Sequence, residues 1–134
     1  MNSQPSSPIY DFAGQVIGLA MKVHSALGPG FLESVYQNAL AHELRKGGFE
    51  VETEVRLKVK YDGVIVGEFA ADMLVAKILL LENKAVHALA VAHEVQLVNY
   101  LTATGLDEGL LLNFGAQRLE FKKKFRQSRS AIET

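Results

Sequence analysis

Apolar residues recur every three or four positions in three segments of the chain, which is the spacing of an amphipathic α-helix. The segments expected to be helical are approximately 10–26, 31–46 and 88–104. The first is expected to bury a stripe made of Ala13, Val16, Ile17, Ala20, Val23 and Leu27. The stripes expected for the second and third are Leu32, Val35, Tyr36, Ala39, Leu40 and Leu44, and Val91, Val95, Val98 and Leu101.

The pattern changes between and after these segments, to alternating or continuous apolar positions rich in β-branched residues, which indicates strands. The expected strands are 49–59, 64–75, 78–84, 110–114 and 119–125. Asp62 and Gly63 separate the first two strands and are typical of a tight hairpin turn. The resulting order, ααβββαββ, predicts an α/β (α+β) fold in which a mixed β-sheet is flanked by helices.

The length of 134 residues predicts one domain. We expect this domain at 10–126, after a polar lead at 1–9 and before a short tail at 127–134. A net charge of −1 argues against a polycation built for nonspecific nucleic-acid binding. The chain has no cysteine, which excludes a disulfide framework and thiolate metal sites. No signal sequence or membrane-length apolar run is evident, so we expect a cytoplasmic protein without a membrane partner.

Three charged residues, Asp72, Glu82 and Lys84, interrupt the apolar strands in the middle of the chain. Such charges are costly unless they are paired, solvated or bound to a metal. The carboxylates of Asp72 and Glu82 would suit Mg²⁺ or Mn²⁺, and Lys84 could orient a water or offset phosphate charge. The same residues could instead form a salt bridge on an exposed strand edge.

The length of the connection between the two strands decides between these interpretations. Directly opposed residues of an antiparallel pair share a face. A two-residue turn at Ala76 and Lys77 would therefore place Asp72 and Glu82 on opposite faces. We predict an odd-length connection or a β-bulge, either of which brings the two carboxylates together.

The segment from Gly30 to Tyr36 matches the signature of the GxxExxY protein family. The segments Gly67–Lys84, His93–Tyr100 and Gly109–Gly115 also resemble this family, so the resemblance covers nearly the whole chain. The family is regarded as a small branch of the PD-(D/E)xK nuclease superfamily, whose core order αβββαβ agrees with the predicted elements.

The resemblance also implies roles for further residues. It implies that Glu33 is an extra metal ligand or a water-positioning acid, and that the backbone carbonyl of Asn83 is a metal ligand. Gln96 would line the site, and Tyr100, on the same helix face, would contact substrate. From its position alone, Glu33 is better explained as a first-turn acid favoured by the helix dipole. Gln96 and Tyr100, four residues apart, could instead satisfy one another in the core. Tyr36 is expected to be a packed aromatic with one hydroxyl partner, and His93 a structural histidine.

The chain departs from the family pattern beside the acidic residues. Ala70 and Ala71 precede Asp72, where family members often carry an arginine or another polar residue, and Asn83 stands where an apolar residue is usual. Substrate contacts could come from the basic C-terminal strand, through Lys122, Lys123 and Lys124. These lysines could equally protect a solvated strand edge against aggregation.

Two functions therefore stay open. The first is a metal-dependent nuclease, endo- or exonuclease, that hydrolyses phosphodiester bonds of DNA or RNA with Mg²⁺ or Mn²⁺. The second is a catalytically silent structural protein that keeps the nuclease-like fold and self-assembles. A homo-oligomer is expected in either case.

Overall fold

The computed structural model describes residues 8–127 of the chain and contains the elements in the expected order ααβββαββ. They are α1 (Pro8–Leu27), α2 (Glu33–Lys46), β1 (Val51–Tyr61), β2 (Val64–Val75), β3 (Leu79–Lys84), α3 (Val91–Thr104), β4 (Glu108–Asn113) and β5 (Glu120–Phe125). The boundaries differ from the expected ones by less than the length of one helical turn. The expected lead at 1–9 and tail at 127–134 lie almost wholly outside the described residues, and Pro8 and Ile9 belong to α1.

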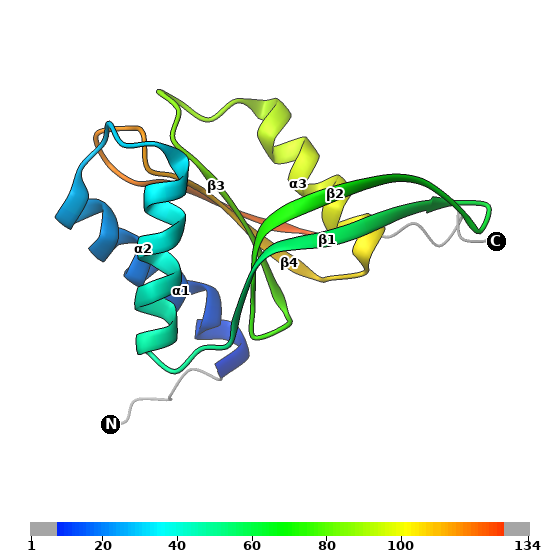
Figure 1. The fold of residues 1–134 in the computed structure, drawn as a ribbon, viewed down its shortest axis with the longest axis horizontal. Helices are drawn as coiled ribbons and strands as arrows, with labels where there is room; N and C mark the ends of the chain where they lie inside the picture. The colour runs from blue at the N-terminus through cyan, green and yellow to red at the C-terminus, as the bar shows by residue number, and fades with distance from the viewer. Residues whose placement is uncertain (1–7, 128–134) are drawn as a thin grey trace.

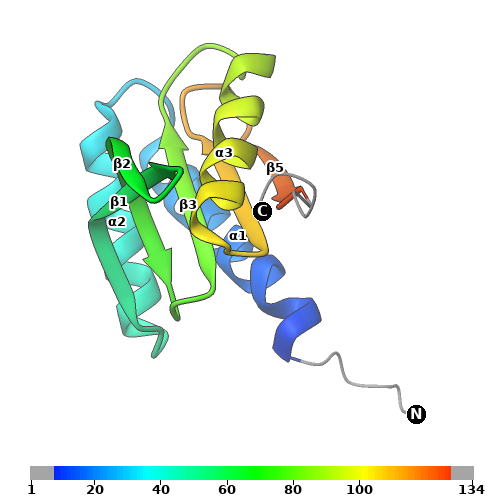
Figure 2. The ribbon, with the colours of Figure 1, turned by 90° about the vertical axis from the view of Figure 1, so that its right-hand side faces the viewer.

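The strands form one five-stranded sheet in the order β1-β2-β3-β4-β5. Only β3 and β4 are parallel, and α3 makes the crossover between them. Figure 2 shows α1 and α2 on one side of the sheet and α3 on the other. The expected mixed sheet flanked by helices is confirmed. Within the described residues, no helix is long and apolar enough to cross a membrane.

A core fills each face of the sheet. On the α1 and α2 face it includes Ala13, Val16, Tyr36, Leu40, Met73, Val75, Leu81, Leu110, Leu112 and Phe114. On the α3 face it includes Ala71, Leu80, Leu97, Leu101 and Leu111. The stripe expected for α1 is buried almost as predicted, because only Leu27, at its C-terminal end, is partly exposed.

The stripes expected for the other two helices are partly wrong. Leu32 and Val35 precede or begin α2 and are exposed, while Ala41 takes part in the core instead. In α3, Leu97 and Leu101 face the sheet, whereas Val91 and Val95 are exposed. Gly109 permits this packing of α3 on the sheet, because a Cβ there would lie only 3.0 Å from a methyl carbon of Leu97.

The hairpin of β1 and β2 extends well beyond the rest of the sheet (Figure 1). The two strands pair from Val51 opposite Val75 to Tyr61 opposite Val64, but β3 pairs only with the last residues of β2. We call residues 55–70 of this hairpin the arm. Its tip is the expected two-residue turn, with left-handed φ angles of 55° at Asp62 and 75° at Gly63.

Candidate functional site

The connection between β2 and β3 has three residues, 76–78, and sets the register of the two strands. Ala76 and Lys77 adopt left-handed φ angles of 54° and 63°, and the N–H of Ile78 donates to the carbonyl of Val75 at 3.1 Å. Val75 pairs with Leu79, so Asp72 faces Glu82 by the same register. The predicted odd-length connection is therefore confirmed.

The side chains of Asp72 and Glu82 continue the hydrogen bonding between β2 and β3 where the backbone pairing ends. The last backbone pair between β2 and β3 is Met73 with Leu81. Beyond it, the N–H of Asp72 donates to Oε2 of Glu82 at 3.0 Å, and the N–H of Asn83 donates to Oδ2 of Asp72 at 2.7 Å. Each carboxylate thus has one oxygen fixed by a backbone amide, which orients the second oxygen for another partner.

Burial of this pair disfavours the charge on both carboxylates. Glu82 is only 6% exposed, and burial, followed by the charge of Asp72, raises the pKa of Glu82 to about 7. Burial also raises the pKa of Asp72, against the hydrogen bond from Asn83 that lowers it. Ionisation of both carboxylates is therefore unfavourable, and a cation between the two groups would offset this cost.

Lys84 lies on the same side of the sheet as Glu82. Leu80 packs beneath α3, and Glu82 and Lys84 follow it at two-residue intervals, so all three project on the α3 face. Lys84 is half-buried, and its charge lowers the pKa of both Asp72 and Glu82. Lys84 is thus placed to partner the acidic pair electrostatically.

The signature Gly30–Tyr36 builds the turn that leads into α2. The ring of Tyr36 is fully buried and stacks on Phe114 with ring centroids 4.8 Å apart. Its hydroxyl donates to the carbonyl of Gly28 and accepts from the N–H of Phe31, so it has two partners rather than the one expected. Gly30 has a φ of 115°, which side chains rarely allow. Tyr36 thereby fixes the start of α2.

Glu33 is the first residue of α2 and is exposed. Its charge raises the pKa of both Asp72 and Glu82. Glu33 therefore adds negative charge to the surroundings of the acidic pair from the start of α2.

Tyr100 and Gln96 approach the pair from α3. The ring of Tyr100 stacks on Phe69 of the arm, with centroids 3.6 Å apart and an interplanar angle of 11°. Burial raises the pKa of Tyr100, the charges of Glu82 and Asp72 raise it further, and Gln96 acts in the opposite direction. His93 accepts a hydrogen bond from the N–H of Ala90 at 3.0 Å, which is a structural role at the start of α3.

The basic residues of β5 are farther from the pair. Glu82 is in register with Leu111 of β4 and Leu111 with Lys122 of β5, so Lys122 stands two strands away, about 10 Å. Lys122 and Lys123 are exposed, whereas Lys124 is ion-paired with Glu94 at 3.0 Å. Lys124 is therefore already partnered within the protein.

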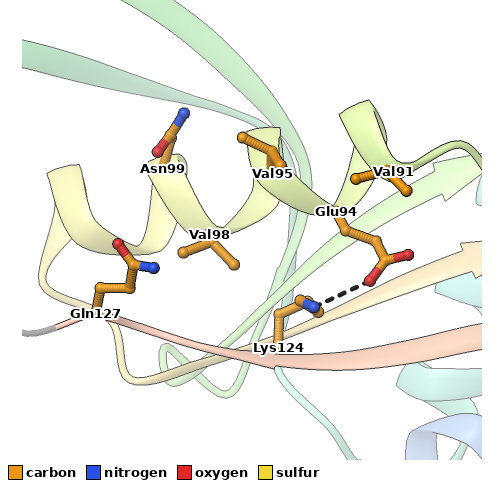
Figure 3. Close-up of a pocket in the computed structure, with 7 residues that line it drawn as sticks. All are labelled: Val91, Glu94, Val95, Val98, Asn99, Lys124 and Gln127. Carbon is orange, nitrogen blue, oxygen red and sulfur yellow. Dashed lines mark hydrogen bonds and ion pairs between the residues drawn. The ribbon is translucent and has the colours of Figure 1, made fainter.

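The ion pair of Lys124 spans a hollow between α3 and β5 (Figure 3). This hollow, of about 310 Å³, is lined by Val91, Glu94, Val95, Val98, Asn99, Lys124 and Gln127. The exposed valines of α3 thus line an open groove, and none of the acidic-pair residues takes part in it.

Glu54 is a further acidic residue beside Asp72, and the sequence did not reveal it. It lies opposite Asp72, between the pairs Thr53–Met73 and Val55–Ala71. Its φ is 52°, a left-handed conformation in mid-strand, and Nε2 of Gln37 donates to its carboxylate at 2.9 Å. Its charge also raises the pKa of Asp72. Strained backbone of this kind is concentrated at functional sites.

The sequence does not single out Glu54, because it occupies a polar position in the alternation of apolar and polar residues along β1. Counting back from the turn at Asp62 and Gly63 places Glu54 opposite Ala71. A register shift beside Val59 leaves Val66 unpaired and moves Glu54 opposite Asp72 instead.

The donor set of the pair fits a hard cation. Mg²⁺ is commonly held by one or two carboxylates and completes its octahedron with waters. Within residues 8–127, no group of three or more histidine, cysteine, aspartate or glutamate side chains is arranged to hold a metal. Asp72 and Glu82 are therefore two adjacent carboxylates, and Glu33 and Glu54 add negative charge to their surroundings.

The middle residue of the Glu-x-Lys motif, Asn83, has its side chain in the core. It is fully buried, and its amide nitrogen donates only to the sulfur of Met73, at 3.2 Å. Among residues 8–127, its amide oxygen has no hydrogen-bond partner. The side chain of Asn83 is therefore on the side away from the carboxylates, and only its backbone is available to the site.

Comparison with known proteins places the chain in one superfamily. The model of the PD-(D/E)XK nuclease superfamily matches residues 10–126, so the chain belongs to that superfamily. Comparison with curated proteins gives no match.

Among solved structures, the chain is similar to one described as the crystal structure of SSO0001, with a TM-score of 0.55 and 19% sequence identity. The match covers 73% of this chain and 52% of that one, so this chain spans about half of the other's length. At this identity the similarity supports the fold alone.

Proposed function

We propose that the protein is a metal-dependent nuclease that hydrolyses phosphodiester bonds of nucleic acid at Asp72 and Glu82. The observation that carries the proposal is the convergence of the two carboxylates, each held by a backbone amide and each with a raised pKa. Buried groups with perturbed pKa values are typical of catalytic sites. Membership of a nuclease superfamily supports the same reaction class.

The free oxygens of Asp72 and Glu82, with the backbone carbonyl of Asn83, would hold Mg²⁺ or Mn²⁺. Such an ion, when bound, lowers the pKa of a coordinated water and stabilises charge on a phosphoryl group. The ammonium group of Lys84 orients the attacking water and offsets the negative charge of the phosphate. Glu33, exposed at the start of α2, positions that water from the other side.

The substrate lies between the acidic pair and α3 in this proposal. Gln96 lines the site, and the Tyr100 hydroxyl, close enough to sense both carboxylates, contacts the substrate. Lys122, which is in register with Leu111 on the α3 face, holds a neighbouring phosphate, whereas Lys123 is in register with Leu110 and projects from the opposite face of β5. Lys124 contributes little, because its ammonium group is paired with Glu94.

We also propose that the chain represents the GxxExxY branch of the superfamily. The three residues that define the signature have connected structural roles here. Gly30 supplies the left-handed turn, Tyr36 locks it through two hydrogen bonds, and Glu33 begins the helix that the turn orients. In this proposal, the signature residues together orient the carboxylate of Glu33 toward the acidic pair.

The experiment is cleavage of single-stranded and duplex DNA and RNA with Mg²⁺, Mn²⁺ or EDTA. Asp72→Asn keeps an oxygen that can accept from Asn83 and should lower the rate about 100-fold or more, as should Lys84→Ala. Lys77→Ala, at the exposed turn between the same strands, is the matched control and should cut like wild type. Equal rates in all four proteins would contradict the proposal.

The alternative is a catalytically silent protein that keeps the fold and self-assembles. This alternative predicts that none of the four substrates is cleaved in the presence of metal, and that the sedimentation coefficient is larger than that of a monomer. A homo-oligomer that cleaves nucleic acid would instead be compatible with the nuclease.

A further inference from the structure

The arm leaves the sheet at the acidic pair. Val55 pairs with Ala71, directly beside Glu54 and Asp72, and from there β1 and β2 continue as a two-stranded ribbon (Figure 1). A ribbon of two strands is marginally stable unless one face is covered. Here the first part of one face is covered by α3, through Leu57 and the stacked Phe69.

The other face of the arm is a row of cations. Arg56, Lys58 and Lys60 occupy alternate positions of β1 and are exposed, whereas the residues between them are half-buried. Alternate residues of a strand project from one face at intervals of about 6.8 Å, so the three cations cover roughly 14 Å. That length corresponds to the rise of about four nucleotides of one strand in a duplex.

These cations are only partly neutralised by the protein. Arg56 approaches Glu68 at 3.6 Å, and both side chains are solvated, so this pair is weak. In the part of the chain that the structure describes, Lys58 and Lys60 form no ion pair. The row therefore keeps its positive charge available to a polyanion.

The tip of the arm adds exposed apolar and aromatic surface. Tyr61 is 75% exposed, and Val64, Ile65 and Val66 are also exposed. Tyr61 follows Lys60 in the chain at the end of the row, and alternation places its ring on the opposite face of the arm from the cations. Exposed aromatic rings and cations together bind a nucleic-acid strand, through stacking on bases and contacts to phosphates.

We propose that the arm is a nucleic-acid binding element that guides one strand of the substrate to the acidic pair. Lys58 and Lys60 contact phosphates, Tyr61 stacks on a base, and the strand reaches Asp72 at the root of the arm. The inference rests on the proposed nuclease function, and it assigns substrate binding to residues of β1 in addition to those of β5. Charge complementarity and continuity with the acidic pair favour nucleic acid over a second copy of the chain.

The test is fluorescence anisotropy with short labelled single-stranded and duplex DNA and RNA in EDTA, as a function of salt. The double variant Lys58→Gln/Lys60→Gln should lose about 1.4 to 1.8 from the slope of log affinity against log salt, or 0.7 to 0.9 for each phosphate contact. Tyr61→Ala should weaken single-strand binding about tenfold. The matched control, Lys22→Gln/Lys77→Gln, removes the same charge from side chains that pair with Glu43 and Glu50, and should keep the wild-type slope.

Several outcomes would overturn the assignment. A wild-type slope in the arm variant, or an equal loss in the control variant, would show that the arm makes no specific phosphate contact. A wild-type dimer that Tyr61→Ala converts to a monomer, with nucleic-acid affinity unchanged, would make the tip an interface between copies. If wild type cleaves nucleic acid while the arm variants bind and cleave equally well, only the arm proposal fails. If wild type neither binds nor cleaves, the proposed function fails with it.

Discussion

Replacement of Glu82 by glutamine should stabilise the metal-free protein while abolishing metal binding at the proposed site. Glutamine keeps an oxygen that can accept from the N–H of Asp72, so the hydrogen bond at 3.0 Å is preserved while the buried charge is removed. A pKa raised from 4.5 to about 7 corresponds to at most roughly 3 kcal/mol of destabilisation once the carboxylate is ionised. We expect a gain of about 1–3 kcal/mol at pH 8.

The pH dependence of the stability difference shows whether the buried charge of Glu82 is its cause. Below pH 4.5, Glu82 is protonated in the folded and unfolded states and contributes no difference. Between pH 4.5 and about 7, the folded state retains a proton that the unfolded state has released, so the stability of wild type falls as pH rises. Above pH 7 the penalty is complete. The advantage of Glu82→Gln should therefore grow across this window and then level off.

Urea unfolding between pH 4 and pH 9 in EDTA measures this difference directly. Glu68→Gln is the matched control, because it makes the same substitution at an exposed position of β2 and should change stability by less than about 0.5 kcal/mol at every pH. Mn²⁺ should then raise the midpoint of thermal unfolding for wild type and not for Glu82→Gln. A variant less stable than wild type at pH 8, or a difference independent of pH, would refute the reasoning.

Three further predictions concern neighbouring residues. Asn83→Leu removes a buried amide oxygen without a partner and should raise the free energy of unfolding by about 1–2 kcal/mol, while Mn²⁺ binding measured by calorimetry persists; a loss of stability would contradict this account. Tyr36→Phe removes both hydrogen bonds to the turn before α2 and should cost about 1–3 kcal/mol in urea unfolding, whereas Tyr61→Phe should cost almost nothing. Glu54→Gln should lower the pKa of Asp72, followed by NMR titration, and Glu52→Gln should not; equal shifts would remove Glu54 from the site.

The order of elements and the pairing of Asp72 with Glu82 could be predicted because both depend on local rules. Helical and alternating periods are visible along the chain, and the parity of a strand connection follows from the two-residue repeat of a strand. The convergence of the carboxylates required only that the connection be odd, and the three-residue turn satisfies this.

What could not be predicted depends on contacts between distant elements. In α3, the valines at 91, 95 and 98 and the leucines at 97 and 101 both follow helical spacing, and only the position of the sheet selects the leucines. The position of Glu54 opposite Asp72 could not be predicted for a similar reason, because a bulge near the tip of the arm changes the register of β1 and β2 many residues away. Such shifts leave no mark on the hydrophobic pattern of β1.

The three-residue turn between β2 and β3 restricts how this segment can vary during evolution. Insertion or deletion of one residue there would rotate every later side chain of β3 to the opposite face and turn Glu82 and Lys84 into the α1 and α2 layer. A change of two residues would preserve the face and change only the length of the loop. Related chains that keep the acidic pair should therefore differ here by even numbers of residues, or carry a compensating bulge.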